Sequence, residues 1–356
     1  RGPRRGAGEL TMIITRTPFR ITLGGGGTDL PAYYSRHGGF VFAAALDKYM
    51  FISVNRPIVD DLVRLKYTRS EIVAHRDQVQ HDIAREAMRM TGIERGLEIT
   101  SMADVPAGTG LGSSSCYAVG LLNALHTLLR QPVSYQALAE EACRLEIDLL
   151  HKPIGKQDQY IASFGGLTVL EIAREGTVTV SRANVSDSTL DDLQRNLLIF
   201  YTGTDRSSLD ILSEQSRGAA QPASPVVESL HAIKEMGCRI REFIEEGDLT
   251  SFGLLLDQHW QHKKKLSSRV TSPHLDALYQ LAKENGALGG KISGAGGGGF
   301  FVFYTERDHQ KLRNSLRAAG LREMRYRFDF EGTKALVNLM DGTFHGNGER
   351  SMAWHA

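Results

Sequence analysis

Hydrophobic and polar residues alternate along the chain in two kinds of pattern. Short runs rich in β-branched and aromatic residues predict the strands of one mixed sheet in the first third of the chain. These runs are MIITRTPFRITL from Met12, which Pro18 is expected to break, then FVFAAAL, MFISVN, LVRLKY and LEITSM. Two further strand-like runs, GLTVLEI and NLLIFYTG, lie in the middle of the chain.

Helical spacing of hydrophobic residues marks the other stretches. From Ser134 to Leu150 the hydrophobic positions follow the i, i+4, i+7 pattern of an amphipathic helix, at Leu138, Ala142, Leu145 and Leu149. Helices are also expected at 78–90 and after Gly112, and three or four helices between about 206 and 286. A strand–helix–strand pattern then ends near residue 341, so the chain is predicted to be an α+β protein.

Length and charge narrow the class of protein. A chain of 356 residues exceeds one ordinary hydrophobic core, which predicts two lobes with a cleft between them. Lys and Arg total 42 and Asp and Glu 41, so charge gives no reason to expect a nucleic-acid or membrane partner. Three widely spaced cysteines suggest neither a disulfide framework nor a zinc cluster. With no long apolar run and no signal-like segment, we expect a cytoplasmic protein.

The expected domain organisation has four parts. Residues 1–11 look like an extension outside the fold, and residues 346–356 look like a loose tail. Between them we expect an N-terminal domain at 12–192 and a C-terminal domain at 193–345.

One glycine-rich segment, PAGTGLGSSS at 106–115, carries the strongest chemical signal. Its glycines allow tight turns and close approach to a ligand, and the free N–H groups at the start of the following helix suit phosphates. A serine there can also offer an oxygen to Mg²⁺. A Gly-rich turn capped by serine, without any ligand, would give the same sequence. The segment matches neither a Walker A loop nor a Rossmann fingerprint. The residues expected to bind nucleotide are Pro106, Gly108, Thr109, Gly110, Leu111, Gly112, Ser113, Ser114 and Ser115.

Two further glycine-rich segments stand far apart from the first. PFRITLGGGGTDLP, from Pro18, places Asp29 at the end of a predicted strand, where a carboxylate could accept hydrogen bonds from sugar hydroxyls. An aspartate that fixes a turn before Pro31 is the alternative. The segment KISGAGGGGF, from Lys291, indicates either a backbone that packs closely against another group or a plain flexible hairpin.

Together, and in this order, the three segments resemble those of the GHMP kinases, a superfamily named for galactokinase and for homoserine, mevalonate and phosphomevalonate kinases. The resemblance implies the two-lobed α+β fold of that family, with mixed sheets, helical layers and a cleft between the domains, and ATP with Mg²⁺ as cofactors. The segment at 106–115 is similar to the family's phosphate loop. Arg20 and Asp29 align with the arginine and the sugar-binding aspartate of the galactokinase pattern. Glycines stand where that pattern has Glu-His, which argues against an ordinary galactokinase.

The resemblance also implies roles for two carboxylates. Asp158, in a segment similar to the family's G-x-x-D-Q, would be the catalytic base, with Arg20 as a second catalytic residue. Glu146 alone would be an ordinary solvated helix carboxylate. Its position twelve residues before Asp158 matches the magnesium ligand of galactokinase-like members, which makes Glu146 and Ser114 the expected metal ligands. The expected substrate-binding residues are Gly26, Gly27, Thr28, Asp29, Arg206, Gly296 and Gly297.

Four segments more closely resemble one group of GHMP kinases, the bacterial D-glycero-D-manno-heptose 7-phosphate kinases. They are RTPFRITLGGGGTDLPAYY, the phosphate loop ending in GSSS, YTGTDRSS, and HKKKLSSRVTSPHLDALYQLAKENGALGGKISGAGGGGF. That likeness implies phosphorylation of the anomeric hydroxyl to the 1,7-bisphosphate, for GDP-heptose and surface-polysaccharide synthesis. The expected partners are a sugar phosphate and ATP, and homo-oligomerisation stays open. For the sugar's own phosphate, Arg206 is the first candidate, with Lys263, Lys264, Lys265 and Arg269 as weaker ones. A kinase for a free fucose- or galactose-like sugar and a catalytically silent ATP- and sugar-binding sensor are the alternatives.

Overall fold

Two β-sheets organise the chain. The computed structural model describes residues 12–203, 208–221 and 224–339. In the described part, the larger sheet has the strand order β12-β1-β2-β5-β3-β4, and β6 joins β2 on one side and β7 on the other. Its strands are β1 (Met12–Gly24), β2 (Gly39–Asn55), β3 (Val63–Lys66), β4 (Ser70–Val73), β5 (Leu97–Ala103), β6 (Leu167–Ile172), β7 (Val178–Arg182) and β12 (Lys334–Asn338).

The two longest strands differ from the sequence expectation. β1 runs unbroken through Pro18, and β2 is one strand where two runs were predicted. Pro18 pairs with Tyr49 and the next residue pairs with Leu46, so the register shifts at the proline. A residue without a backbone N–H is tolerated at such an irregularity. The predicted break is therefore a bulge inside a continuous hairpin.

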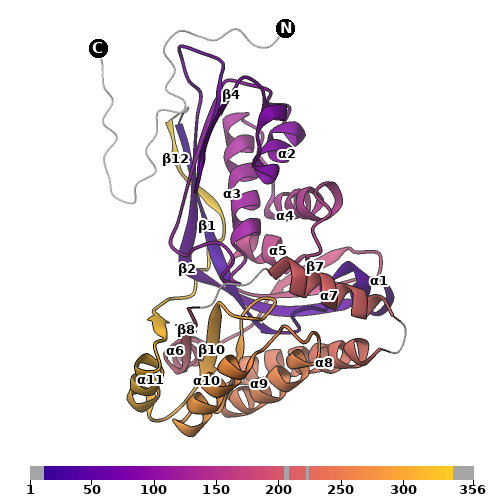
Figure 1. Ribbon diagram of the computed structural model, residues 1–356, viewed down its shortest axis with the longest axis vertical. Coiled ribbons are helices and arrows are strands. Elements are labelled where there is room, and N and C mark those ends of the chain that lie inside the picture. The colour runs from indigo at the N-terminus through magenta and orange to yellow at the C-terminus, as the bar shows by residue number, and fades with distance from the viewer. Residues whose placement is uncertain (1–11, 204–207, 222–223, 340–356) are drawn as a thin grey trace.

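Helices cover one face of this sheet (Figure 1). They are α2 (Asp82–Met90), α3 (Ser113–Leu128), α4 (Tyr135–Cys143) and α5 (Gln157–Phe164). α3 is buried along most of its length and packs against β1 and β2. The first residues of β1 alternate between buried and half-buried, as expected where only one face of a sheet is covered. The rest of β1 is fully buried, because α8 and α9 pack against it from the other side.

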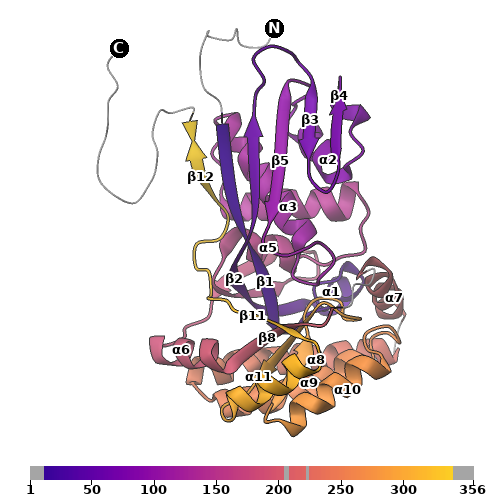
Figure 2. The same ribbon diagram turned by 60° about the vertical axis from the view of Figure 1, so that its left-hand side comes forward.

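The second sheet has the order β11-β8-β10-β9 and carries most of the remaining helices (Figure 2). Its strands are β8 (Leu197–Tyr201), β9 (Gly289–Ile292), β10 (Phe300–Tyr304) and β11 (Arg322–Met324). The helices outside the first layer are α1 (Pro31–His37), α6 (Asp187–Asn196), α7 (Ser208–Ala220), α8 (Pro225–Glu246), α9 (Leu249–Lys264), α10 (Pro273–Glu284) and α11 (His309–Ala318). Four of these helices, α7 to α10, fill the region where three or four were predicted, and the α+β class is confirmed.

The end of the described chain returns to the first sheet. β12 pairs antiparallel with β1, more than 300 residues away in sequence. The division into domains at 12–192 and 193–345 stays a proposal, with β12 crossing back over it. Among the described residues no helix is both long and apolar enough to cross a membrane.

Candidate active site

The segment at 106–115 forms a loop that leads directly into α3. Gly108, Gly110 and Gly112 have φ of +83°, +83° and +84°, a region that favours glycine. Gly112 is the N-cap of α3, whose first residues are serines. The loop borders a cavity of about 840 Å³. The predicted nucleotide-binding residues that line it are Pro106, Gly108, Gly110, Gly112, Ser113, Ser114 and Ser115.

Two members of the loop do not line this cavity. Leu111 is buried in the hydrophobic core, and the Thr109 hydroxyl donates to the Pro106 carbonyl oxygen at 2.9 Å. Their contribution in the structure is to hold the loop's shape.

The C-terminal glycine segment packs on the back of this loop. A Cβ atom added at Gly294 would lie 2.6 Å from the carbonyl oxygen of Gly110, and one added at Gly299 would lie 2.1 Å from that of Thr109. Real Cβ atoms do not approach backbone so closely, so glycine is needed at both positions. The C-terminal glycine segment therefore packs closely against the loop at 106–115.

Arg20 links the loop to the predicted base. The residue is only 3% exposed, and its side chain donates from Nε to Asp158 Oδ1 and from Nη1 to the Gly110 carbonyl oxygen, both at 2.7 Å. Asp158 lies in the first turn of α5 and remains partly exposed, at 24%. Both residues also border the large cavity, so the phosphate loop and Asp158 share one space.

Glu146 is fully buried, whereas a lone helix carboxylate would be expected on a solvated face. The single helix predicted for 134–150 ends at Cys143 and continues as a π-helical turn, Arg144–Leu149, which carries Glu146. Such turns occur often at functional sites. The carboxylate accepts hydrogen bonds from Ser114 at 2.5 Å, Ser115 at 2.6 Å and Gln159 at 2.7 Å.

The Glu146 carboxylate and the Ser114 hydroxyl fit a magnesium site whose remaining ligands are phosphate oxygens and water. Among the described residues no group of three or more His, Cys, Asp or Glu could hold a metal. Mg²⁺ commonly takes only one or two protein oxygens beside a nucleotide. Ser114 lines the large cavity, and the Glu146 carboxylate lies directly behind it, hydrogen-bonded to the Ser114 hydroxyl. Lys152, which sequence reasoning missed, adds a cation 3.2 Å from the Ser114 hydroxyl.

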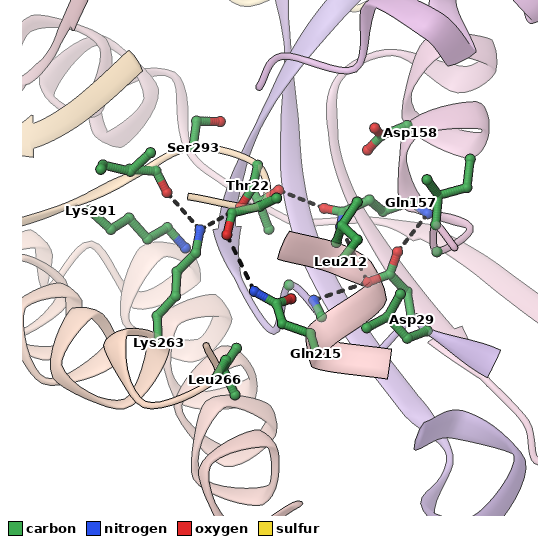
Figure 3. Close-up of a pocket in the computed structure, with 18 of the residues that line it drawn as sticks. Thr22, Asp29, Gln157, Asp158, Leu212, Gln215, Lys263, Leu266, Lys291 and Ser293 are labelled. Atoms are coloured by element: carbon green, nitrogen blue, oxygen red, sulfur yellow. Dashed lines mark hydrogen bonds between the residues drawn. The ribbon is translucent and has the colours of Figure 1, made fainter. Parts of the chain in front are cut away.

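Asp29 lies in a smaller cavity of about 70 Å³ that also contains Arg20 and Asp158. Its carboxylate accepts hydrogen bonds from the backbone N–H of Gly27 at 3.0 Å and from the backbone and side-chain amides of Gln157 at 3.1 and 3.2 Å (Figure 3). Burial raises the pKa of Asp29, and the nearby Asp158 adds to that rise, while the two backbone donors oppose it.

Glycines also shape the small cavity. A Cβ atom at Gly155 would lie 1.9 Å from Asp29 Oδ2, which explains the glycine of the G-x-x-D-Q segment. Gly26 and Gly27, two of the expected substrate-binding residues, line this cavity. Gln157 belongs to the same short motif as Asp158, and that proximity was the signal that could have identified it.

Four predicted substrate-binding residues are not placed at the cavity walls by the structure. Thr28 is buried, and its hydroxyl donates to the carbonyl oxygens of Gly25 and Phe40. Gly296 and Gly297 border neither cavity. They pack against Val270, whose carbonyl oxygen accepts from the Gly297 N–H at 2.7 Å. The fourth, Arg206, lies outside the described residues.

The basic run near the end of α9 separates into two environments. Lys265 is exposed and Lys264 half-buried, as expected of a solvated face, but Lys263 is 7% exposed and lines the small cavity. The same wall includes Lys291 and His259, which sequence reasoning did not single out as ligand-binding residues.

Comparison with known proteins agrees with this geometry. The family models "GHMP kinases N terminal domain" and "GHMP kinases C terminal" match residues 78–166 and 240–321. The chain is 29% identical over 336 residues to a D-glycero-alpha-D-manno-heptose 7-phosphate kinase of Campylobacter jejuni, covering 91% of this chain and 98% of that protein. It is 26% identical over 334 residues to an L-fucokinase/L-fucose-1-P guanylyltransferase of Bacteroides fragilis, covering 84% of this chain and 35% of that protein.

A solved structure shares the fold. The crystal structure of a D-glycero-D-manno-heptose 1-phosphate kinase from Bacteroides thetaiotaomicron superimposes with a TM-score of 0.74 at 22% identity, covering 91% of this chain and 98% of that one. Both family domains are thus present, in order, around a cavity that joins a glycine-rich phosphate loop to a carboxylate. The chain belongs to the GHMP kinases, phosphotransferases that act on hydroxyl groups, and among them it is a sugar kinase.

Proposed function

We propose that this protein is a cytoplasmic kinase that transfers the γ-phosphate of ATP to the anomeric hydroxyl of D-glycero-D-manno-heptose 7-phosphate. The product would be the 1,7-bisphosphate, a precursor for GDP-heptose and surface polysaccharide. The observation that carries the proposal is the pair of hydrogen bonds from Arg20, one to the phosphate loop and one to Asp158. The heptose 7-phosphate kinase relative, matched over nearly its whole length, supports the choice of acceptor.

In this proposal each residue has one task. The N–H groups of the phosphate loop and the start of α3 hold the β- and γ-phosphates. Asp29 orients the sugar, and Asp158 accepts the proton of the anomeric hydroxyl as its oxygen forms a bond to the γ-phosphorus and ADP leaves. Arg20 lies beside both groups, where its fixed positive charge would stabilise the transferring phosphoryl group.

GHMP kinases use ATP, typically with Mg²⁺, and the metal would be held here by Glu146 and Ser114. When bound, Mg²⁺ supplies positive charge against the phosphate oxygens. The hydrogen bonds from Ser115 and Gln159 fix the Glu146 carboxylate in place on the protein's side of that site.

A coupled assay of ADP release tests the proposal. The acceptors would be D-glycero-D-manno-heptose 7-phosphate, the free heptose, L-fucose and D-galactose, each with and without Mg²⁺. We expect turnover of the heptose 7-phosphate to exceed that of every free sugar, and to fall to background for Asp158→Asn. Turnover of free sugars alone would refute the acceptor and leave the kinase reaction intact.

A kinase for a free sugar is the second candidate. The relative that contains an L-fucokinase favours it. A silent ATP- and sugar-binding sensor would bind both ligands in the same assay without releasing ADP, and the Arg20–Asp158 pair beside the phosphate loop argues against it.

A further inference from the structure

One wall of the small cavity is built from basic side chains. Lys263 and His259 come from α9, and Lys291 comes from β9; they are 7%, 1% and 2% exposed. Figure 3 shows Lys263 and Lys291 on one side of the cavity and Asp29 with Gln157 on the other. The cavity is therefore polar at both ends, with carboxylates at one and cations at the other.

The two lysines lack acidic partners. Lys263 donates to the carbonyl oxygens of Ile292 and Gly294 at 2.7 and 2.5 Å, and Lys291 donates to that of Leu23 at 2.7 Å. Within the described ranges no carboxylate lies within 4.0 Å of either ammonium group. An ammonium group has three donors, so both lysines keep hydrogen-bonding capacity. Buried cations without counter-charges are costly, and burial lowers the pKa of Lys263 to about 7 and holds the pKa of Lys291 well below its ordinary value.

Other polar atoms on this wall are also without partners. Both ring nitrogens of His259 and the hydroxyl of Ser293 are buried, and they make no hydrogen bond within the described parts of the chain. Buried polar groups are nearly always hydrogen-bonded. Four residues with unused hydrogen-bonding capacity, two of them lysines, thus line one cavity, and Asp158 lines the same cavity.

The remaining charged groups around Lys263 do not neutralise it. Arg20, on β1, lowers the pKa of Lys263 further and is itself paired with Asp158. Asp29 lies on the opposite wall and is held by Gly27 and Gln157. Among the described residues of this wall no carboxylate balances the ammonium form of the two lysines, and an anion within the cavity would supply that counter-charge.

We propose that Lys263, Lys291, His259 and Ser293 form the subsite for the phosphate group that the sugar acceptor already carries. This inference rests on the proposed function, since it assigns the second anion of a sugar phosphate. The anomeric hydroxyl would lie at Asp158 and the terminal phosphate at the opposite wall. A phosphate dianion supplies the counter-charge and the acceptor oxygens that this wall lacks.

Replacement of Lys263 tests the subsite, with Lys265→Met as the matched control. Both lysines lie in the same basic run, but Lys265 is exposed. For Lys263→Met we expect the KM for heptose 7-phosphate to rise about 10- to 100-fold, the loss typical of a hydrogen bond to a charged group, with the KM for ATP unchanged. Lys265→Met should leave both values unchanged. If Lys263→Met does not fold, Ser293→Ala should raise the acceptor KM alone, by about 5-fold.

Other outcomes would overturn the inference. A lysine that only ties the glycine segment in place would, when replaced, change the KM for ATP and for the acceptor together, because that segment packs on the phosphate loop. A fall in kcat with an unchanged acceptor KM would instead indicate contact with the transferring phosphoryl group. Either result contradicts a phosphate subsite.

A binding measurement separates this inference from the proposed reaction. With saturating ADP on the enzyme, calorimetric titration with inorganic phosphate should show binding to the wild type and to Lys265→Met, but about 10-fold or weaker binding to Lys263→Met. If heptose 7-phosphate is not turned over and this difference persists, the acceptor is wrong and the anion subsite stands. If heptose 7-phosphate is turned over and no difference is seen, the subsite is wrong and the reaction stands.

Discussion

The contact between the two glycine loops can be tested by Gly110→Ala. At a φ of +83° any side chain beyond that of glycine costs about 1–2 kcal/mol of stability, even where there is room for it. In addition, the new Cβ would lie 2.7 Å from the carbonyl oxygen of Ser293, and ordinary contact begins near 3.4 Å. The loops must therefore separate by roughly 0.7 Å at the place where the phosphates bind. Since a misplacement of about 1 Å can cost 10²-fold in rate, we expect kcat/KM for ATP to fall about 10- to 100-fold.

Gly92→Ala is the matched control for this change. Gly92 also has a positive φ, +71°, but a Cβ there would meet nothing within 4 Å. Gly92→Ala should lose about 1–2 kcal/mol in urea unfolding and Gly110→Ala at least as much, and only Gly110→Ala should lose activity in the ADP-release assay. Wild-type kinetics for Gly110→Ala, or equal losses of activity in both variants, would show that the loop contact does not position the phosphate loop.

Three further predictions concern side chains of the site. Asp158→Asn should lower kcat about 10²- to 10⁴-fold with little change in the KM for ATP, and a smaller loss would argue against a general base. Glu146→Gln should raise the Mg²⁺ concentration needed for half-maximal rate, which a Mg²⁺ titration at fixed ATP would measure; an unchanged requirement would remove Glu146 as a ligand. Burial, and then the charge of Arg20, lower the pKa of Lys263 to about 7, so its ammonium form is present below that pH and lost above it. The KM for a phosphorylated acceptor should therefore rise between pH 7 and pH 9, and Lys263→Arg, which stays charged, should flatten that rise.

Local sequence signals predicted residues that the structure brings to the walls of two cavities. The phosphate loop has glycines at three positions of positive φ, and the helix that follows begins at the wall of the large cavity. Asp29 and Asp158 each stand in a short motif with a glycine nearby, and the structure places both carboxylates in one cavity. The requirement for Gly155 comes from Asp29, so two motifs more than a hundred residues apart explain each other.

Strand continuity was predicted less well, for a physical reason. A proline normally interrupts a central strand, and whether it does so depends on how the neighbouring strand pairs with it. Here the partner of the proline is Tyr49 and the partner of the next residue is Leu46, so the proline lies at a register shift, an irregularity that tolerates a residue without a backbone N–H. That shift belongs to the pairing of two strands and has no signature in either strand alone.

The sequence by itself determined which chemistry this chain carries: glycines for a phosphate loop, a carboxylate at a helix start, and an arginine on the first strand. Only the tertiary structure decided which lysine of the basic run lines the small cavity. Lys263 and Lys265 have the same chemistry and nearly the same position in sequence, but α9 packs on β9 along the face that carries Lys263 and leaves Lys265 exposed. Whether a lysine on a helix is buried depends on which other elements pack against that face of the helix. Those elements are far apart in sequence, so the sequence near the lysine does not reveal them.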